Sequence, residues 1–172
     1  MMAPRRVRPA VLVAGIGNEL CGDDGVGPAV VRYLAEEPAT SPAVAVIRVV
    51  EGPLDLLELW AGAAVSVVVD ATISGAAPGS VRVVDLDVEL GDGDAGVGAA
   101  GHGAPTSSHG FGLASALAMA RALDTAPARV VLVGVEGAGF EVGTPLSPAV
   151  AAAVPVAAAQ VRCLVEELRL CA

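Results

Sequence analysis

Lysine is absent from this sequence of 172 residues, and aromatic side chains make up only 2% of it. All 10 Lys/Arg positions are arginine, against 19 acidic residues, so the net charge is −9. Nucleic acid and anionic membranes attract proteins with the opposite balance, and both are excluded as partners. With so few aromatic residues, the core must be built from valine, leucine and alanine.

Cysteine is also scarce. The 3 cysteines, Cys21, Cys163 and Cys171, form no CxxC pair, so neither a disulfide framework nor a zinc knuckle is predicted. The arginines near the N-terminus precede an apolar run that is too short for a secretory signal, and no uninterrupted apolar stretch reaches the roughly 20 residues of a membrane span. We therefore expect a protein of the reducing cytoplasm that does not enter a membrane.

Valine-rich runs alternate with helical patterns along the whole chain, which we expect to form one domain over residues 1–172. Strands are predicted at 11–14, 44–50, 65–69, 81–84 and 130–135. This alternation indicates an α/β three-layer sandwich, with a twisted, mostly parallel five-stranded sheet and helices on both faces. The connection between 65–69 and 81–84 is too short for a crossover helix, so these strands are predicted to be antiparallel neighbours.

Helices are expected between most of these strands. One should begin near Val26, a second should span Leu54 to Trp60, and a third should begin near His109. A fourth is predicted to start at Pro148, because serine precedes it as a potential cap. The glycine-rich residues 87–106 show no apolar period and are predicted to be a surface loop.

The turn between the first strand and the first helix, residues 15–27, is rich in glycine and acid. A dinucleotide site would need glycine at Leu20, and the carboxylates of Asp23 and Asp24 would repel a phosphate. One of these two acids can cap the helix. The other has no evident structural duty, so one of the pair is a candidate for a functional role.

Three candidate side chains follow predicted strands at the same edge of the sheet. Each also has a purely structural interpretation: Asp24 as a helix cap, Asp70 as a turn acid and His109 as a loop histidine. Together, two carboxylates and an imidazole can bind a first-row divalent metal. Glu51 and Glu136 are expected at that edge too. Either could be a general base or could support the ligands, and each is also explained as a solvated strand-end acid.

Four stretches resemble one protein family. They are GIGNELCGDDGVG at 15–27, VVVDATISGAAPG at 67–79, SSHGFGLASAL at 107–117 and VGVEGAGFEVGTPLSPAV at 133–150. In this order and spacing, the chain resembles the maturation endopeptidases of nickel-iron hydrogenases over nearly its whole length. By motif, the family's metal ligands fall on Asp24, Asp70 and His109.

The resemblance implies an endopeptidase of the aspartic or metal-assisted type. The family makes a single cut that removes a C-terminal extension from the hydrogenase large-subunit precursor after nickel insertion. The precursor would then be the partner, and its nickel would complete the site, so that no permanently bound metal is expected. The catalytic candidates are Asp24, Asp70, His109 and Glu51.

One position departs from the family pattern. Many members have Asp-Gly-Gly-Thr where this chain has Glu-Gly-Pro-Leu at 51–54, so Glu51 stands in place of the family aspartate. Two other functions remain open. One is a non-catalytic chaperone that recognises nickel-loaded precursor, and the other is a zinc-dependent metallohydrolase that uses His102 as an added ligand.

Overall fold

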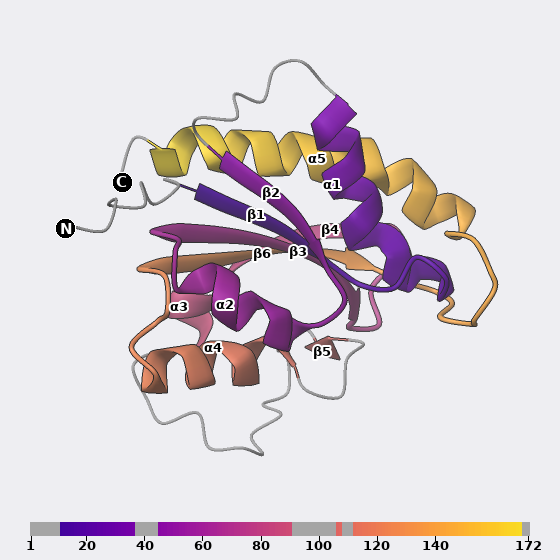
Figure 1. Cartoon of the computed structure of the whole chain (residues 1–172). Coiled ribbons are helices and arrows are strands. Elements are labelled where there is room, and N and C mark those ends of the chain that lie inside the picture. The colour runs from indigo at the N-terminus through magenta and orange to yellow at the C-terminus, as the bar shows by residue number, and fades with distance from the viewer. Residues whose placement is uncertain (1–10, 37–44, 91–105, 108–111, 170–172) are drawn as a thin grey trace.

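The computed structural model describes residues 11–36, 45–90, 106–107 and 112–169, which form one sheet with helices on both faces (Figure 1). Its strands are β1 (Val11–Ile16), β2 (Ala45–Val50), β3 (Val65–Ile73), β4 (Val81–Asp85), β5 (Thr106–Ser107) and β6 (Arg129–Glu136). Each of the five predicted strands is present. The two-residue β5 was not predicted, because two polar residues in a glycine-rich stretch carry no strand pattern.

The sheet has the strand order β2-β1-β3-β6-β4, and β5 pairs with the end of β3. β2, β1, β3 and β6 run parallel, whereas β4 is antiparallel to β6 and β5 is antiparallel to β3. The predicted α/β fold with a mostly parallel sheet is therefore confirmed.

The prediction that the strands at 65–69 and 81–84 are neighbours was wrong, because β6 lies between β3 and β4. The connection from β3 to β4 crosses the end of β6. There the N–H of Gly79 donates to the backbone oxygen of Glu136 at 2.8 Å, and the N–H of Glu136 donates to that of Ser80 at 2.9 Å. The strand between β3 and β4 is thus β6, which comes later in the chain.

The helical segments are η1 (Gly22–Gly25), α1 (Val26–Glu36), η2 (Pro53–Asp55), α2 (Leu56–Trp60), α3 (Leu86–Leu90), α4 (Leu113–Ala122) and α5 (Pro148–Arg169). The helices predicted near Val26 and Pro148 begin at those residues. The predicted start near His109 lies outside the described residues, where α4 is described from Leu113. α3 was not predicted, since it occupies the border of the glycine-rich stretch.

Two hydrophobic cores lie on opposite faces of the sheet. Along β1, Val11 and Val13 point to the face covered by α1 and α5, and Leu12 and Ile16 point to the face of α2, α3 and α4 (Figure 1). This alternation follows the two-residue period of a strand. Burial on both faces explains why the strands are nearly continuous runs of valine, leucine and isoleucine.

Within the part of the chain that the structure describes, α5 is the single helix that is long and apolar enough to cross a membrane, judged by length and composition alone. The helix continues through Pro155 and Arg162 to Arg169. Its buried residues, among them Val150 and Val161, pack with α1 against the sheet. This packing accounts for the apolar face as that of a core helix.

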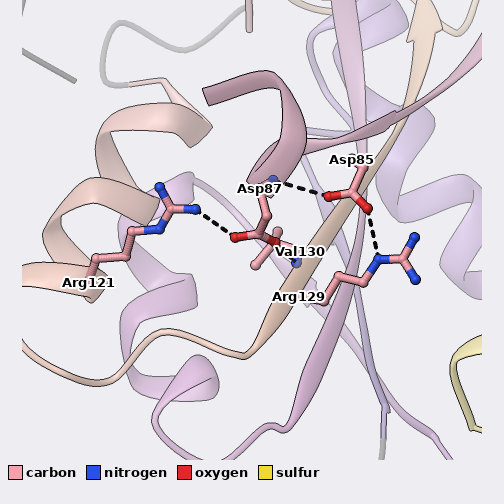
Figure 2. Close-up of polar contacts among 5 residues, drawn as sticks. All are labelled: Asp85, Asp87, Arg121, Arg129 and Val130. Atoms are coloured by element: carbon pink, nitrogen blue, oxygen red, sulfur yellow. Dashed lines mark hydrogen bonds and ion pairs between the residues drawn. The ribbon is translucent and has the colours of Figure 1, made fainter. Parts of the chain in front are cut away.

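A polar cluster holds α3 in place at the amino end of β6 (Figure 2). Asp87 accepts a bond from Arg121 of α4 at 2.6 Å and from the N–H of Val130 at 2.8 Å. Nε of Arg129 donates to Asp85 at 2.8 Å. The cluster joins α3, α4, β4 and β6 at the edge of the sheet opposite the carboxyl ends of the parallel strands.

Candidate active site

Asp24 lies in the turn that joins β1 to α1. The chain turns at Gly17, whose φ of 135° is a conformation that side chains disfavour. A Cβ at Gly17 would lie 1.8 Å from the backbone oxygen of Asp24, so the turn requires glycine. The N–H of Asn18 donates to Oδ2 of Asp24 at 2.7 Å. The Asp24 side chain is thereby held at the carboxyl end of β1 with 7% exposure.

Asp70 lies within β3, which continues to Ile73, and not in the loop that was predicted to begin after residue 69. It is in register with Gly134 of the neighbouring β6 and is 1% exposed. Burying a carboxylate is costly unless it is compensated by partners. A buried acid near the end of a central strand therefore remains a strong candidate for chemistry.

Two glycines bring the segments that carry these acids into contact. A Cβ at Gly27 would lie 2.6 Å from the backbone oxygen of Val69, and a Cβ at Gly15 would lie 2.3 Å from that of Gly27. α1 therefore begins in backbone contact with β1 and β3, and η1, which carries Asp24, contacts β3. The glycines of the first motif place Asp24 beside the strand that carries Asp70.

Asp23 has a structural role that distinguishes it from its neighbour. The side chain is fully buried, and it accepts N–H bonds from Ala138 at 2.8 Å, Gly139 at 3.1 Å and Ser147 at 2.6 Å. Burial raises the pKa of Asp23, but these donors outweigh it and hold the pKa below its ordinary value of 3.8. Asp23 thus anchors η1 to the β6–α5 loop, which leaves Asp24 as the candidate for chemistry.

Replacing Asp23 with asparagine is expected to lower the free energy of unfolding at pH 7 by about 2 kcal/mol, because an amide nitrogen cannot accept the N–H bonds. The folded-state pKa of Asp23 is depressed. Its stabilisation is therefore present above the unfolded pKa of about 3.9 and is lost as the pH falls through the folded value. Urea titrations between about pH 5 and pH 2 should show a steeper loss for the wild type than for Asp23→Asn.

Asp55→Asn is the matched control, because Asp55 is exposed and accepts one backbone bond, from Gly52 at 3.1 Å. This variant should follow the wild-type pH profile. Parallel profiles for the wild type and Asp23→Asn would show that the Asp23 carboxylate is not the anchor described.

Glu51 follows β2 at the same edge of the sheet. The N–H of Gly17 donates to the backbone oxygen of Val50 at 3.1 Å, which ties the end of β2 to the turn that holds Asp24. The Glu51 side chain itself is exposed. Glu51 is thus near the turn that carries Asp24 but, unlike Asp24 and Asp70, it is not withdrawn from water.

His109 and His102 lie outside the described residues. The segment before His109 is placed, because Ser107 of β5 pairs with Thr72 of β3. Thr72 follows Asp70 by two residues, and Ser107 precedes His109 by two. The pairing of β5 therefore brings the chain to the end of β3 that carries Asp70.

Glu136 is bound by four donors and is not free to act as the base considered above. It accepts bonds from the N–H and Oγ of Ser74 at 2.7 and 2.8 Å, the N–H of Gly75 at 2.8 Å and Oγ1 of Thr72 at 3.1 Å. Burial raises the pKa of Glu136, but these bonds outweigh it and hold the pKa below its ordinary 4.5. No pattern in the sequence indicated these partners, which come from the end of β3 and the β3–β4 turn.

Metal-binding side chains among the described residues are few. They contain no group of three or more histidine, cysteine, aspartate or glutamate side chains able to hold an ion. Asp24 and Asp70 supply two oxygen-donor side chains at adjoining segments. Two carboxylates without softer ligands bind a borderline divalent cation loosely, so a firm site here needs donors from elsewhere.

These features define an α/β protein with two buried candidate acids, Asp24 and Asp70, at the carboxyl edge of its sheet, the edge where open α/β sheets bind ligands. Buried acids occupy the place where a nucleotide-binding protein has a phosphate-binding turn. Leu20 stands where such a turn needs glycine, and its side chain is 68% exposed. The turn between β1 and α1 is therefore not that of a nucleotide-binding domain.

Comparison with known proteins identifies the family. Residues 28–162 match the hydrogenase maturation protease family. The hydrogenase expression/formation protein HupD of Rhodobacter capsulatus is 34% identical over 164 residues, which cover 92% of this chain and 71% of HupD. The chain belongs to the hydrogenase maturation protease family and is an endopeptidase.

Solved structures share the fold. The hydrogenase maturating endopeptidase HybD from E. coli matches with a TM-score of 0.70 and 26% identity, over 91% of this chain and 92% of that one. The [NiFe] hydrogenase maturation protease HybD from Thermococcus kodakarensis matches with a TM-score of 0.64 and 26% identity, over 90% and 98% of the two chains. The resemblance stated from the sequence motifs is confirmed.

Proposed function

We propose that this endopeptidase removes the C-terminal extension of a nickel-iron hydrogenase large-subunit precursor, and that nickel carried by the precursor completes a site formed by Asp24, Asp70 and His109. The observation that carries the proposal is the glycine-mediated contact of η1 and α1 with β3. This contact places two buried acids on adjoining segments at one edge of the sheet.

The proposed reaction is hydrolysis of one peptide bond. Water adds to the scissile carbonyl carbon, the C–N bond breaks, and the leaving amine takes a proton. Asp24, Asp70 and His109 would hold the nickel of the bound substrate, which would supply Lewis-acid polarisation of the carbonyl. Glu51, exposed at the same edge, accepts the proton of the attacking water and passes it to the leaving amine.

The proposed setting is the cytoplasm, with the precursor as partner. The cysteines that the structure describes, Cys21 and Cys163, are free thiols, which suits a reducing compartment. The net charge of −9 argues against nucleic acid as a further partner.

The experiment is to incubate purified protein with nickel-loaded precursor and to measure the mass of the product. We expect the wild type to yield a large subunit shortened at its C-terminus. Glu51→Gln should slow the reaction by about 10²-fold, because the amide keeps the shape of the side chain but cannot accept the proton.

Glu58→Gln, a change of the same kind at an exposed position of α2, serves as the control and should cleave at the wild-type rate. An unchanged precursor mass with the wild type would favour a chaperone that recognises the precursor without cutting it. Normal turnover by Glu51→Gln would show that Glu51 is a solvated strand-end acid that takes no part in the reaction.

A further inference from the structure

Glu136 is a buried carboxylate at the carboxyl edge that the proposed reaction does not use. It ends β6, is 3% exposed, and accepts bonds from Thr72, Ser74 and Gly75. The backbone N–H of Gly137, the next residue, donates to the oxygen of Thr72 at 3.0 Å. The Glu136 side chain and the backbone that follows it therefore form hydrogen bonds to the same short segment.

That segment is the end of β3. Thr72 lies in register with Glu136 on one side and with Ser107 of β5 on the other, and it follows Asp70 by two residues. β3 extends beyond the parallel pairing with β1, which stops at Val69. Glu136 is thus the side chain that holds the protruding end of β3, between Asp70 and the turn to β4.

We propose that Glu136 is a positioning residue of the proteolytic site, which fixes the strand end that carries Asp70 and pairs with β5, the strand that precedes His109. The proposal rests on the proposed role of Asp70. Glu136 acts through geometry, because two bonds to backbone N–H groups and two to hydroxyl groups occupy its carboxylate. It neither touches the substrate nor moves a proton.

The bonding pattern distinguishes two substitutions. In Glu136→Gln, the amide oxygen accepts the N–H groups of Ser74 and Gly75, while the amide nitrogen donates to the hydroxyls of Thr72 and Ser74. Glu136→Ala loses all four bonds. A displacement of about 1 Å in a catalytic group can cost about 10²-fold in rate. We therefore expect kcat of Glu136→Ala to fall about 10²-fold with KM nearly unchanged, and Glu136→Gln to restore kcat.

Asp87→Ala is the matched structural control. Asp87 is also a carboxylate that binds a backbone N–H, that of Val130, but at the opposite end of β6 (Figure 2). kcat and KM for cleavage of nickel-loaded precursor are measured for the three variants and the wild type, alongside thermal melts. Asp87→Ala should lower the Tm and leave kcat unchanged at temperatures where the protein is folded.

Thr72→Val provides a second test that does not depend on the folding of Glu136→Ala. It removes the hydroxyl that links Glu136 directly to β3 and keeps the shape of the side chain, and kcat should fall about 10-fold. Wild-type kcat in Thr72→Val, or a loss in Glu136→Ala that Asp87→Ala reproduces at an equal fall in Tm, would overturn the proposal. Full activity of Asp70→Asn would instead overturn the proposed site itself.

Discussion

Asp70→Asn is expected to abolish processing of the precursor while the protein stays folded. Asp70 is 1% exposed on β3, so water cannot readily replace the lost charge. Asparagine keeps the size of the side chain but is neutral and has one oxygen fewer with which to bind a metal. We expect kcat/KM to fall by about 10³-fold or more, measured by the mass of the processed subunit, with an unchanged far-UV CD spectrum.

Asp85→Asn makes the same chemical change away from the site. Asp85 lies on β4 at the opposite edge of the sheet, where it pairs with Arg129 at 2.8 Å. This variant should process the precursor at the wild-type rate. Normal cleavage by Asp70→Asn would show that the ligand assignment is wrong, and loss of its CD spectrum would make Asp70 a structural residue.

Nickel in the precursor is expected to decide whether cleavage occurs. The described residues offer the carboxylates of Asp24 and Asp70 but no group of three metal-binding side chains, so the isolated protein should hold nickel loosely. In the family that the sequence resembles, the nickel is already in the precursor when cutting occurs. Under the proposed function, docking would add ligands to a metal that the substrate holds, and the combined coordination would select loaded over unloaded substrate.

Two measurements follow from this loose binding. The purified protein should contain no stoichiometric nickel by elemental analysis. A synthetic peptide that spans the scissile bond should stay intact, because it brings no metal to the site. Tight nickel binding by the isolated protein, or cleavage of the bare peptide, would contradict this selection.

The sequence predicts the layers of the fold well, because apolar runs report directly on burial. The runs at 11–14 and 65–69 are buried on both faces, and that burial is local information. β4 pairs with β6, a strand that comes later in the chain. Neither the sequence of the β3–β4 connection nor its length indicates this pairing. α3 depends on the bonds of Asp87 to Arg121 and Val130, which are also distant in sequence.

The candidate site shows the same limit. Spacing after the strands singles out Asp24 and Asp70, and the structure places them on contacting segments at one edge. Spacing does not reveal that Asp23 is the structural acid of the adjacent pair, because the donors to Asp23 lie more than 100 residues away. The strand-end position of Glu136 indicates a possible base, whereas its four bonds make it an anchor. The partners of a buried carboxylate are set by tertiary structure and not by the residues beside it.

The most direct test of the account compares precursor from nickel-replete and nickel-starved cells. Each sample is incubated with purified protein without added metal, and the mass of the large subunit is measured before and after. Only the nickel-loaded precursor should lose its C-terminal extension, and Asp70→Asn should leave both samples uncut. Equal processing of the two samples would contradict the account and leave an ordinary acid-dependent protease.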